Sequence, residues 1–254
     1  MSRRILLLLA ILASETAATQ LKPEVPTGSR LAVKKEPTLA APKETRQIIA
    51  EFARCAIKKH RTDAVQLVLD PSTTYDNNVK RVADPDCLTG TAWRQSNGSV
   101  MSLPPDIMMY ALADALVNDE LPRFDPSLIE GAAPLPRGLL EAVFTPKPDK
   151  HYSAKELKDL ETARATAASR ESFRAFGECV VRSDPVRSHA LLRTKATSAE
   201  EGSAIQSMMP SFGQCLEQGQ EFQANRTMIR GAVALAYYRL AHAPRAAPAA
   251  GASK

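Results

Sequence analysis

The four cysteines are the residues whose types and spacing most clearly predict chemistry. Cys55 and Cys179 each end a Phe-x-x-Cys motif, and each is followed further along the chain by a Cys-Leu pair, which supplies Cys87 and Cys215. An even number of cysteines predicts disulfides in an exported protein, and metal or redox chemistry in a cytosolic one. Three pairings are possible. The repeated pattern favours the structural disulfides Cys55–Cys87 and Cys179–Cys215, because each then closes within one copy.

The other chemically capable residues lack the partners that catalysis or cofactor binding needs. There is no Cys-x-x-Cys, and the four histidines are scattered singly, which argues against a metal site. His60 fits a cation at a helix C-terminus, and His189 has no neighbour that would make it a general base. Neither G-x-x-x-x-G-K-[ST] nor H-E-x-x-H occurs. We therefore expect no catalytic, metal-binding or cofactor-binding residues and no cofactor.

The beginning of the chain has the pattern of an export signal. Arg3 and Arg4 precede an unbroken apolar run, Ile5–Ala13, and small residues follow up to Ala18. This run is too short to span a bilayer and is typical of a signal peptide. We expect cleavage after Ala18 and a periplasmic or secreted mature chain. No later run reaches the roughly 18 apolar residues of a transmembrane helix, so we expect no transmembrane segment in the mature chain.

The composition excludes a nucleic-acid-binding protein. The formal net charge is only +5, aromatic residues make up 5% of the chain, and no block of like charges is present. The mild positive charge leaves two interpretations open, namely a preference for an anionic partner and an ordinary soluble basic protein.

Proline content and apolar periodicity divide the chain into segments. Four prolines mark the segment before the first helical pattern, and six more mark the connector between the two helical regions. The expected organisation is a signal peptide (1–18), a Pro-rich flexible tether (19–43), helical unit 1 (44–118), a connector that contains the start of a long polar helix (119–168), helical unit 2 (169–242) and a disordered tail (243–254).

The two helical units match each other position by position. Phe52 and Phe176 lie 124 positions apart, and this offset relates the first helices, whereas an offset of 121 relates the last helices, 107–116 and 228–237. Apolar residues recur at helical spacing in both units, so each helix should bury one face. The sequence thus predicts an all-α fold of duplicated four-helix units, with one intra-unit disulfide each, packed as a single globular body. Its core should include Phe52, Phe176, Leu112 and Val233.

Features that the two units do not share are the candidates for recognition. Trp93 and Arg94 lie in a polar loop, and Arg226 and Arg230 lie at the start of the last helix, where the other unit has proline and methionine. Arginines there could collect an anion together with the free amides of the helix N-terminus. The alternatives are ordinary surface arginines and a tryptophan folded onto the core. The connector segment Leu139–Phe144 is a further candidate.

Three short motifs carry a resemblance to a family. They are F-x-x-C-V-V-R at Phe176–Arg182, the following Cys-Leu pair, and N-R-x-x-x-R-G at Asn225–Gly231. Together with the export signal and the tether, they resemble uncharacterised exported proteins of sphingomonad-type alphaproteobacteria with a duplicated F-x-x-C … C-L helical unit. The resemblance spans roughly 44–242. It implies the compartment and the fold, and it implies no activity.

Two functions remain as expectations. The first is an exported, non-enzymatic binding or interaction protein, whose unknown ligand is a protein or an anionic partner. The second is a periplasmic hydrolase-like enzyme with a site between the two helical units. A polar cleft that gathers residues from both units would favour the enzyme, and an apolar surface patch would favour the binding protein.

Overall fold

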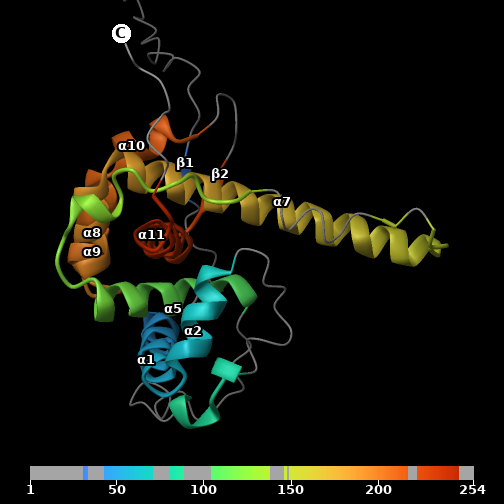
Figure 1. Ribbon diagram of the computed structural model, residues 1–254, viewed down its shortest axis with the longest axis horizontal. Helices are drawn as coiled ribbons and strands as arrows, with labels where there is room; N and C mark the ends of the chain where they lie inside the picture. Colours follow the sequence, from blue (N-terminus) through green and yellow to red (C-terminus); the bar gives the residue numbers. More distant parts are fainter. Residues whose placement is uncertain are drawn as a thin grey trace, which may run out of the picture.

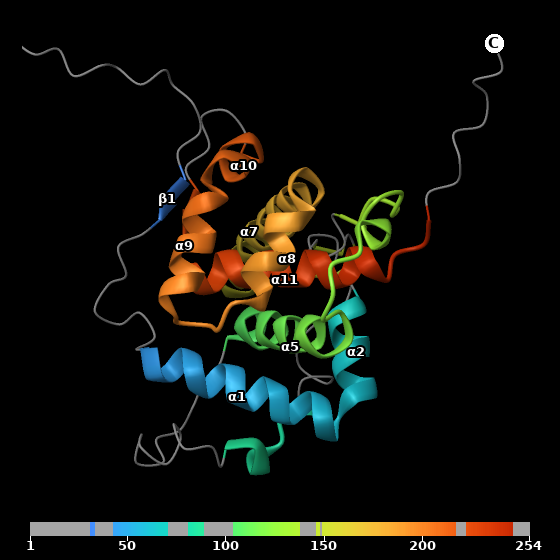
Figure 2. The same ribbon diagram turned by 90° about the vertical axis from the view of Figure 1, so that its left-hand side faces the viewer.

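The computed structural model describes residues 31–33, 43–70, 81–88, 104–137, 146–147, 149–216 and 222–245. These residues form a mainly α-helical body (Figures 1 and 2). Its α-helices are α1 (Lys43–Lys59), α2 (Arg61–Leu69), α5 (Pro105–Glu120), α7 (Ala154–Ser183), α8 (Pro185–Arg193), α9 (Ala199–Ser207), α10 (Met209–Gln214) and α11 (Arg226–Ala241). Two 3₁₀ turns, η1 (Pro85–Leu88) and η2 (Pro126–Leu128), and two strands, β1 (Leu31–Val33) and β2 (Phe222–Ala224), complete it.

Both predicted disulfides are confirmed. Cys55 in α1 is bonded to Cys87 in η1, with Cα atoms 5.4 Å apart, and Cys179 in α7 is bonded to Cys215 just after α10, with Cα atoms 5.6 Å apart. Each disulfide joins the first long helix of its half to the segment that leads into the last one. The chain therefore has one covalent link in each half, and neither link crosses between the halves.

The long helices pack in the order α1, α5, α11, α7. Helix α11 lies between α5 and α7, with α8 beside it, and α1 covers the other side of α5 (Figures 1 and 2). Contacts also cross reciprocally between the halves, because α2 touches α11 and α8 touches α5. Helix α11 is consequently buried along most of its length, from Ile229 to Leu240.

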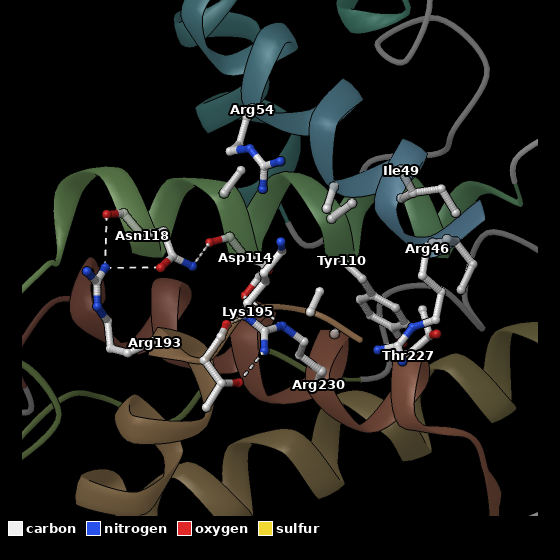
Figure 3. Close-up of a pocket in the computed structure, with 17 residues that line it drawn as sticks. Arg46, Ile49, Arg54, Tyr110, Asp114, Asn118, Arg193, Lys195, Thr227 and Arg230 are labelled. Atoms are coloured by element: carbon white, nitrogen blue, oxygen red, sulfur yellow. Dashed lines mark hydrogen bonds and ion pairs between the residues drawn. The ribbon is translucent and has the colours of Figure 1, made fainter. Parts of the chain in front are cut away.

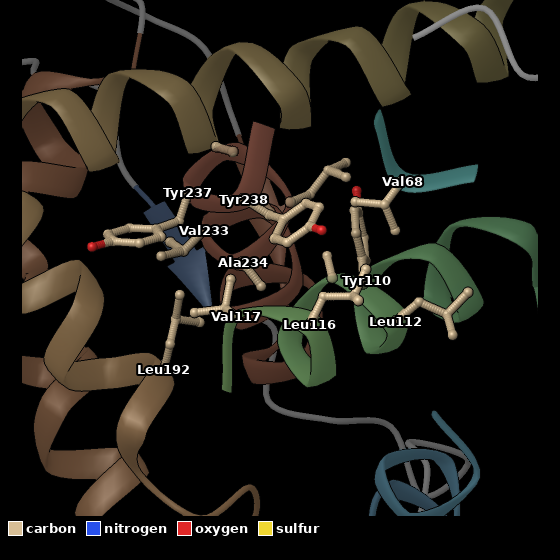
Figure 4. Packing of buried hydrophobic residues seen from close by; sticks show 14 of the residues in the cluster. Val68, Tyr110, Leu112, Leu116, Val117, Leu192, Val233, Ala234, Tyr237 and Tyr238 are labelled. Atoms are coloured by element: carbon tan, nitrogen blue, oxygen red, sulfur yellow. The ribbon is translucent and has the colours of Figure 1, made fainter. Parts of the chain in front are cut away.

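The predicted core positions are buried as expected. Phe52, Phe176, Leu112 and Val233 are all at most 3% exposed, and they belong to one continuous hydrophobic cluster. Figure 4 shows part of this cluster, with Leu112, Leu116 and Val117 on α5 and Val233 and Ala234 on α11. Helices α5 and α11 contact each other, and the apolar stripes that the sequence predicts on them contribute to one core.

The shorter helices of the second half agree with the pattern of the sequence. The helix predicted over 198–209 is α9, and the break or restart predicted at Pro210 is confirmed, because α9 ends at Ser207 and Pro210 lies in the first turn of α10. The described part of the second half consequently has five helices where four were expected. The matching helix expected over 73–83 lies largely on 71–80, outside the described residues.

The long polar helix expected from about Ser153 is confirmed. Ser153 and Glu156 form a capping box, in which the Ser153 hydroxyl accepts from the Glu156 amide and the Glu156 carboxylate accepts from the Ser153 amide. The helix then continues to Ser183, across the expected boundary at 168. Its N-terminal part extends away from the other helices (Figure 1).

A short strand pairing was not expected from the sequence. Leu31–Val33, within the segment expected to be a flexible tether, pairs in parallel with Phe222–Ala224. The pairing satisfies backbone groups in both segments.

Candidate functional site

A pocket of about 330 Å³ lies between the two halves of the helical body. Helices α1 and α5 form one side, and the loop after α8 together with the start of α11 forms the other (Figure 3). Five of its lining residues are cations, whereas a single carboxylate lines it. The cations are Arg46, Arg54, Arg193, Lys195 and Arg230, and the carboxylate is that of Asp114.

Arg230 forms the floor of the pocket, and its guanidinium is fully engaged. The side chain donates to the carbonyl oxygens of Leu191, Leu192 and Thr194, each at 3.0 Å. It also forms an ion pair with Asp114, 2.9 Å between Nη2 and Oδ1. Arg230 is only 5% exposed, so the interpretation of this residue as an ordinary surface arginine is wrong. It joins the last turn of α8 to α11 and to α5.

Glu201 holds the loop that forms one wall of the pocket. Its buried carboxylate accepts from Arg46 at 2.8 Å and from the backbone amide of Thr197 at 3.0 Å. Thr197 has a φ of 72°, which is uncommon for a β-branched residue and costs conformational energy. The bond to Glu201 offsets this strain. Because Arg46 comes from α1, the same carboxylate connects the loop to the opposite half.

Asp114 is the only carboxylate among the described residues that line the pocket. Burial raises its pKa, and the neighbouring charge of Arg230 acts in the opposite direction. Its ion pair with Arg230 uses Oδ1. Asp114 therefore neutralises the buried arginine of the floor, and it forms no ion pair with the cations nearer the opening.

Arg54 and Lys195 are the two lining cations whose charged ends have neither an ion pair nor a hydrogen bond among the described residues, whereas the guanidinium of Arg193 donates to Asn118. Arg54 is exposed on α1, and Lys195 is exposed on the loop after α8. Figure 3 shows that Arg54 reaches from one wall and Lys195 from the other, so that their charged ends point toward one another. The two halves of the molecule thus each contribute one free positive charge to the same space.

The remaining walls are fixed and largely apolar. Asn118 closes one end, where its amide donates to the Leu192 carbonyl at 3.0 Å and its side-chain oxygen accepts from Arg193 at 3.0 Å. Ile49, Ile107 and small residues of α1 and α5 line the sides. The pocket therefore combines apolar walls with a positively charged opening.

The lining residues provide little for covalent or acid-base catalysis. The described lining residues include no serine, cysteine or histidine. The hydroxyl of Thr194 donates to the Leu191 carbonyl at 2.6 Å and accepts from Arg230 at 3.0 Å, so it is already engaged. Nucleophilic catalysis needs a nucleophile next to a base, and the pocket walls do not supply this pair. The chemistry that its residues support is the binding of negative charge.

Arg226 and His189, which the sequence also singles out, do not line this pocket. Arg226 is exposed, and its guanidinium lies beside Gly202 of α9. His189 is buried between the rings of Phe124 and Tyr237, and a ring nitrogen lies 3.0 Å from the Leu121 carbonyl oxygen. Trp93, Arg94 and the segment Leu139–Phe144 lie outside the described residues.

His60 lies between α1 and α2, at the C-terminal end of α1, which is the expected position. Of the two recognition candidates in the described part of the chain, Arg230 lines the pocket and Arg226 does not.

Sequence reasoning missed most of the pocket, although a signal was present. Arg46, Ala50 and Arg54 recur every fourth residue on α1, and Asp114 and Asn118 do so on α5. This spacing places each set on one helix face. The sequence alone does not show that these faces of α1 and α5 line the same pocket.

Comparisons with protein-family models, with curated proteins and with solved structures find no match. No helix in the described ranges is both long and apolar enough to cross a membrane. Within the same ranges, no group of three or more His, Cys, Asp or Glu side chains is arranged to hold a metal ion. The functional argument consequently depends on the geometry of the pocket.

Proposed function

We propose that this protein is a non-enzymatic binding protein whose pocket between the halves takes a small anionic ligand. The observation that carries the proposal is the pair of free cations, Arg54 and Lys195, that face each other from opposite halves. Unpaired charged groups bind an oppositely charged ligand without first breaking an internal ion pair. The volume of about 330 Å³ is that of a small-molecule site.

The buried ion pairs below these cations support the same proposal. Arg230 and Arg46 are each neutralised, by Asp114 and Glu201 respectively. A floor of paired charges keeps the pocket rigid, whereas the unpaired charges near the opening stay free for a ligand. The site is thus preformed, which lowers the entropy lost on binding.

A hydrolase-like enzyme with a site in this pocket is the second candidate. The observation that favours it is that polar residues from both halves converge on one carboxylate, Asp114, whose pKa is raised by burial. A carboxylic acid with a raised pKa is a common general acid. The types of residue in the walls favour binding over this alternative.

We also propose that the chain is exported and that its two halves are duplicates. Two intact disulfides in the described body support an oxidising compartment. Reciprocal contacts support the duplication. Asn118 donates to the Leu192 carbonyl, and Arg239 donates to the Val68 carbonyl. The two bonds are equivalent by the offsets, because the donors Asn118 and Arg239 lie 121 positions apart and the acceptors Val68 and Leu192 lie 124 positions apart.

Thermal unfolding in the presence of anions tests the binding proposal. Sulfate and benzoate, each compared with chloride at equal ionic strength, should raise the Tm of the wild type, because a ligand that binds only the native state stabilises it. The double variant Arg54→Met, Lys195→Met should lose this rise. Lys58→Met removes an exposed charge one turn along α1 and is the matched control, which should keep the rise. An equal response in all three proteins would contradict a specific site.

The same proteins separate the two candidates. Chromogenic carboxyl and phosphate esters should not be turned over by the wild type if the site only binds. Turnover that Asp114→Asn abolishes, with anion binding retained, would instead establish the enzyme.

A further inference from the structure

The two helices that cross at the centre of the body carry very different residues at the crossing point. Tyr110 of α5 faces Gly231 of α11, and a Cβ placed on Gly231 would overlap the Cβ and ring of Tyr110. These positions are 121 residues apart, so the proposed duplication makes them equivalent. Equivalent residues meet at the axis that relates two copies of a unit. One copy therefore has a phenol ring where the other has no side chain.

The hydroxyl of Tyr110 lies in the counterpart of the pocket. Its surroundings include the charged groups of Asp106, Arg170, Arg174 and Arg239, and burial raises its pKa. By the offsets of 121 and 124, the equivalent positions in the other half are Thr227, Arg46, Ala50 and Asn118, in the same order. All four of the latter line the pocket. The side chain of Tyr110 thus occupies, on one side of the crossing, the space that is open on the other.

The two sides also differ in charge. Arg54 of the open side corresponds to Glu178 of the filled side. Glu178 is buried and already accepts from the Leu135 amide and from Arg182. The filled side therefore has a neutralised carboxylate where the open side has a free guanidinium. A ring that enters the open side would meet the unpaired charge of Arg54 at the position where the filled side has a neutralised carboxylate.

We infer that the ligand of the pocket is a single-ring aromatic acid, in which the ring takes the place that Tyr110 takes on the filled side and the acid group meets Arg54 and Lys195. The inference rests on the proposed function and narrows its ligand class. Ile49 and Ile107 flank the ring, and Arg46 lies at the end of the pocket near Tyr110 and Thr227 (Figure 3). A guanidinium on a ring face adds an attraction that a saturated ring lacks.

Calorimetric titration with four small probes tests the inference on the full chain. Benzoate should bind at least about tenfold more tightly than acetate, which lacks the ring, and than benzyl alcohol, which lacks the charge. Cyclohexanecarboxylate, with the same charge and a saturated ring, should bind about threefold more weakly than benzoate. Equal affinity of benzoate and cyclohexanecarboxylate would overturn the aromatic class.

A variant that fills the pocket provides an independent test. Ala50→Phe places a ring in the open side from α1, at a lining position that is not fully buried, and should reduce benzoate affinity at least about tenfold. Ala50→Ser changes the same position without filling it and should retain binding. Unfolding curves of both variants establish that the fold is kept.

The outcomes separate this inference from the function on which it rests. If acetate and sulfate bind as well as benzoate, and Arg54→Met abolishes all three, the anion site stands and the aromatic ligand is wrong. If no anion responds to Arg54→Met and Lys195→Met, both proposals are wrong. Retained benzoate binding in a folded Ala50→Phe protein would place the ligand elsewhere and overturn the inference.

Discussion

The two sides of the α5–α11 crossing have the same framework and opposite contents. On one side, the ring of Tyr110 fills the space between α5, α7 and α11, and Arg239 satisfies the end of α2. On the other side, Gly231 leaves that space open, and Asn118 satisfies the end of α8. The contacts between helices are similar on the two sides. The side chains that fill the space, and the charges around it, are different.

This difference helps to distinguish residues that hold the fold together from residues that could bind a ligand. Residues that recur in both halves hold helices together, as the buried stripes and both disulfides do. Residues that occur in one half alone lie outside this shared pattern, and Arg54, Asp114 and Arg230 gather around a single pocket. A close comparison of two similar halves thus separates scaffold from site without any relative of known activity.

The largest expected effect follows from emptying the filled side. Tyr110 is 6% exposed, and Tyr110→Ala should lower the free energy of unfolding by roughly 3–5 kcal/mol, as large-to-small core changes do. Urea unfolding measures this change. A small apolar phenol such as 4-methylphenol should restore part of the Tm, because engineered cavities bind matching molecules. A loss below about 1 kcal/mol would show that Tyr110 does not fill this space.

Replacing the glycine at the crossing should have the next largest effect. Gly231→Ala forces a Cβ against Tyr110, and the overpacking should cost about 1–3 kcal/mol. Gly213→Ala is the control, because no atom lies within 4 Å of its added Cβ. That variant should gain about 0.4–1 kcal/mol from reduced entropy of the unfolded chain. Equal effects of both changes in urea unfolding would contradict the close approach of α5 and α11.

A change within the open side should alter binding rather than stability. Asp114→Asn removes the carboxylate that neutralises Arg230, so the pocket becomes more positive and an anion should bind up to roughly tenfold more tightly. Titration of benzoate at fixed ionic strength provides the measurement. Weaker binding would contradict this expectation, and it would show that the Asp114 carboxylate accepts a hydrogen bond from the ligand.

The smallest expected effect concerns the disulfide-linked end of α1. Asp84 lies 3.1 Å from a ring nitrogen of His60 and 3.1 Å from Lys59. These groups and the Asp86 amide hold the pKa of Asp84 at about 2, below its ordinary value of 3.8. The carboxylate therefore stabilises the fold above pH 3.8, and this contribution is lost as pH falls through about 2.

Asp84→Asn should accordingly be less stable than the wild type at neutral pH. The difference between the two proteins should shrink as the pH approaches 2 in acid unfolding. A difference that stays constant over this range would exclude the carboxylate as its source.

The helices and disulfides could be predicted because their signals are local or repeated. The stripe of α5 includes Met108, Leu112 and Leu116, and it needs only helical periodicity to be seen. The disulfides followed from a motif that occurs twice. By contrast, the pairing of β1 with β2 joins segments almost 200 residues apart in a chain of 254, and no local pattern specifies it.

The pocket could not be predicted, because its residues acquire meaning only from their neighbours. Arg230 and Arg226 look alike in the sequence, four positions apart on one helix. The structure places Arg230 under the last turn of α8, where three carbonyl oxygens need donors, and leaves Arg226 exposed. Burial of an arginine depends on such acceptors, which another helix provides here.

The measurement that tests the central claim most directly is a crystal structure of the protein grown with 4-bromobenzoate. Anomalous scattering locates the bromine independently of any interpretation of the density. The account predicts a bromine peak in the pocket, between Ile49 and Ile107, with the carboxylate between Arg54 and Lys195. A crystal at a saturating concentration in which the pocket has no bromine peak would contradict it.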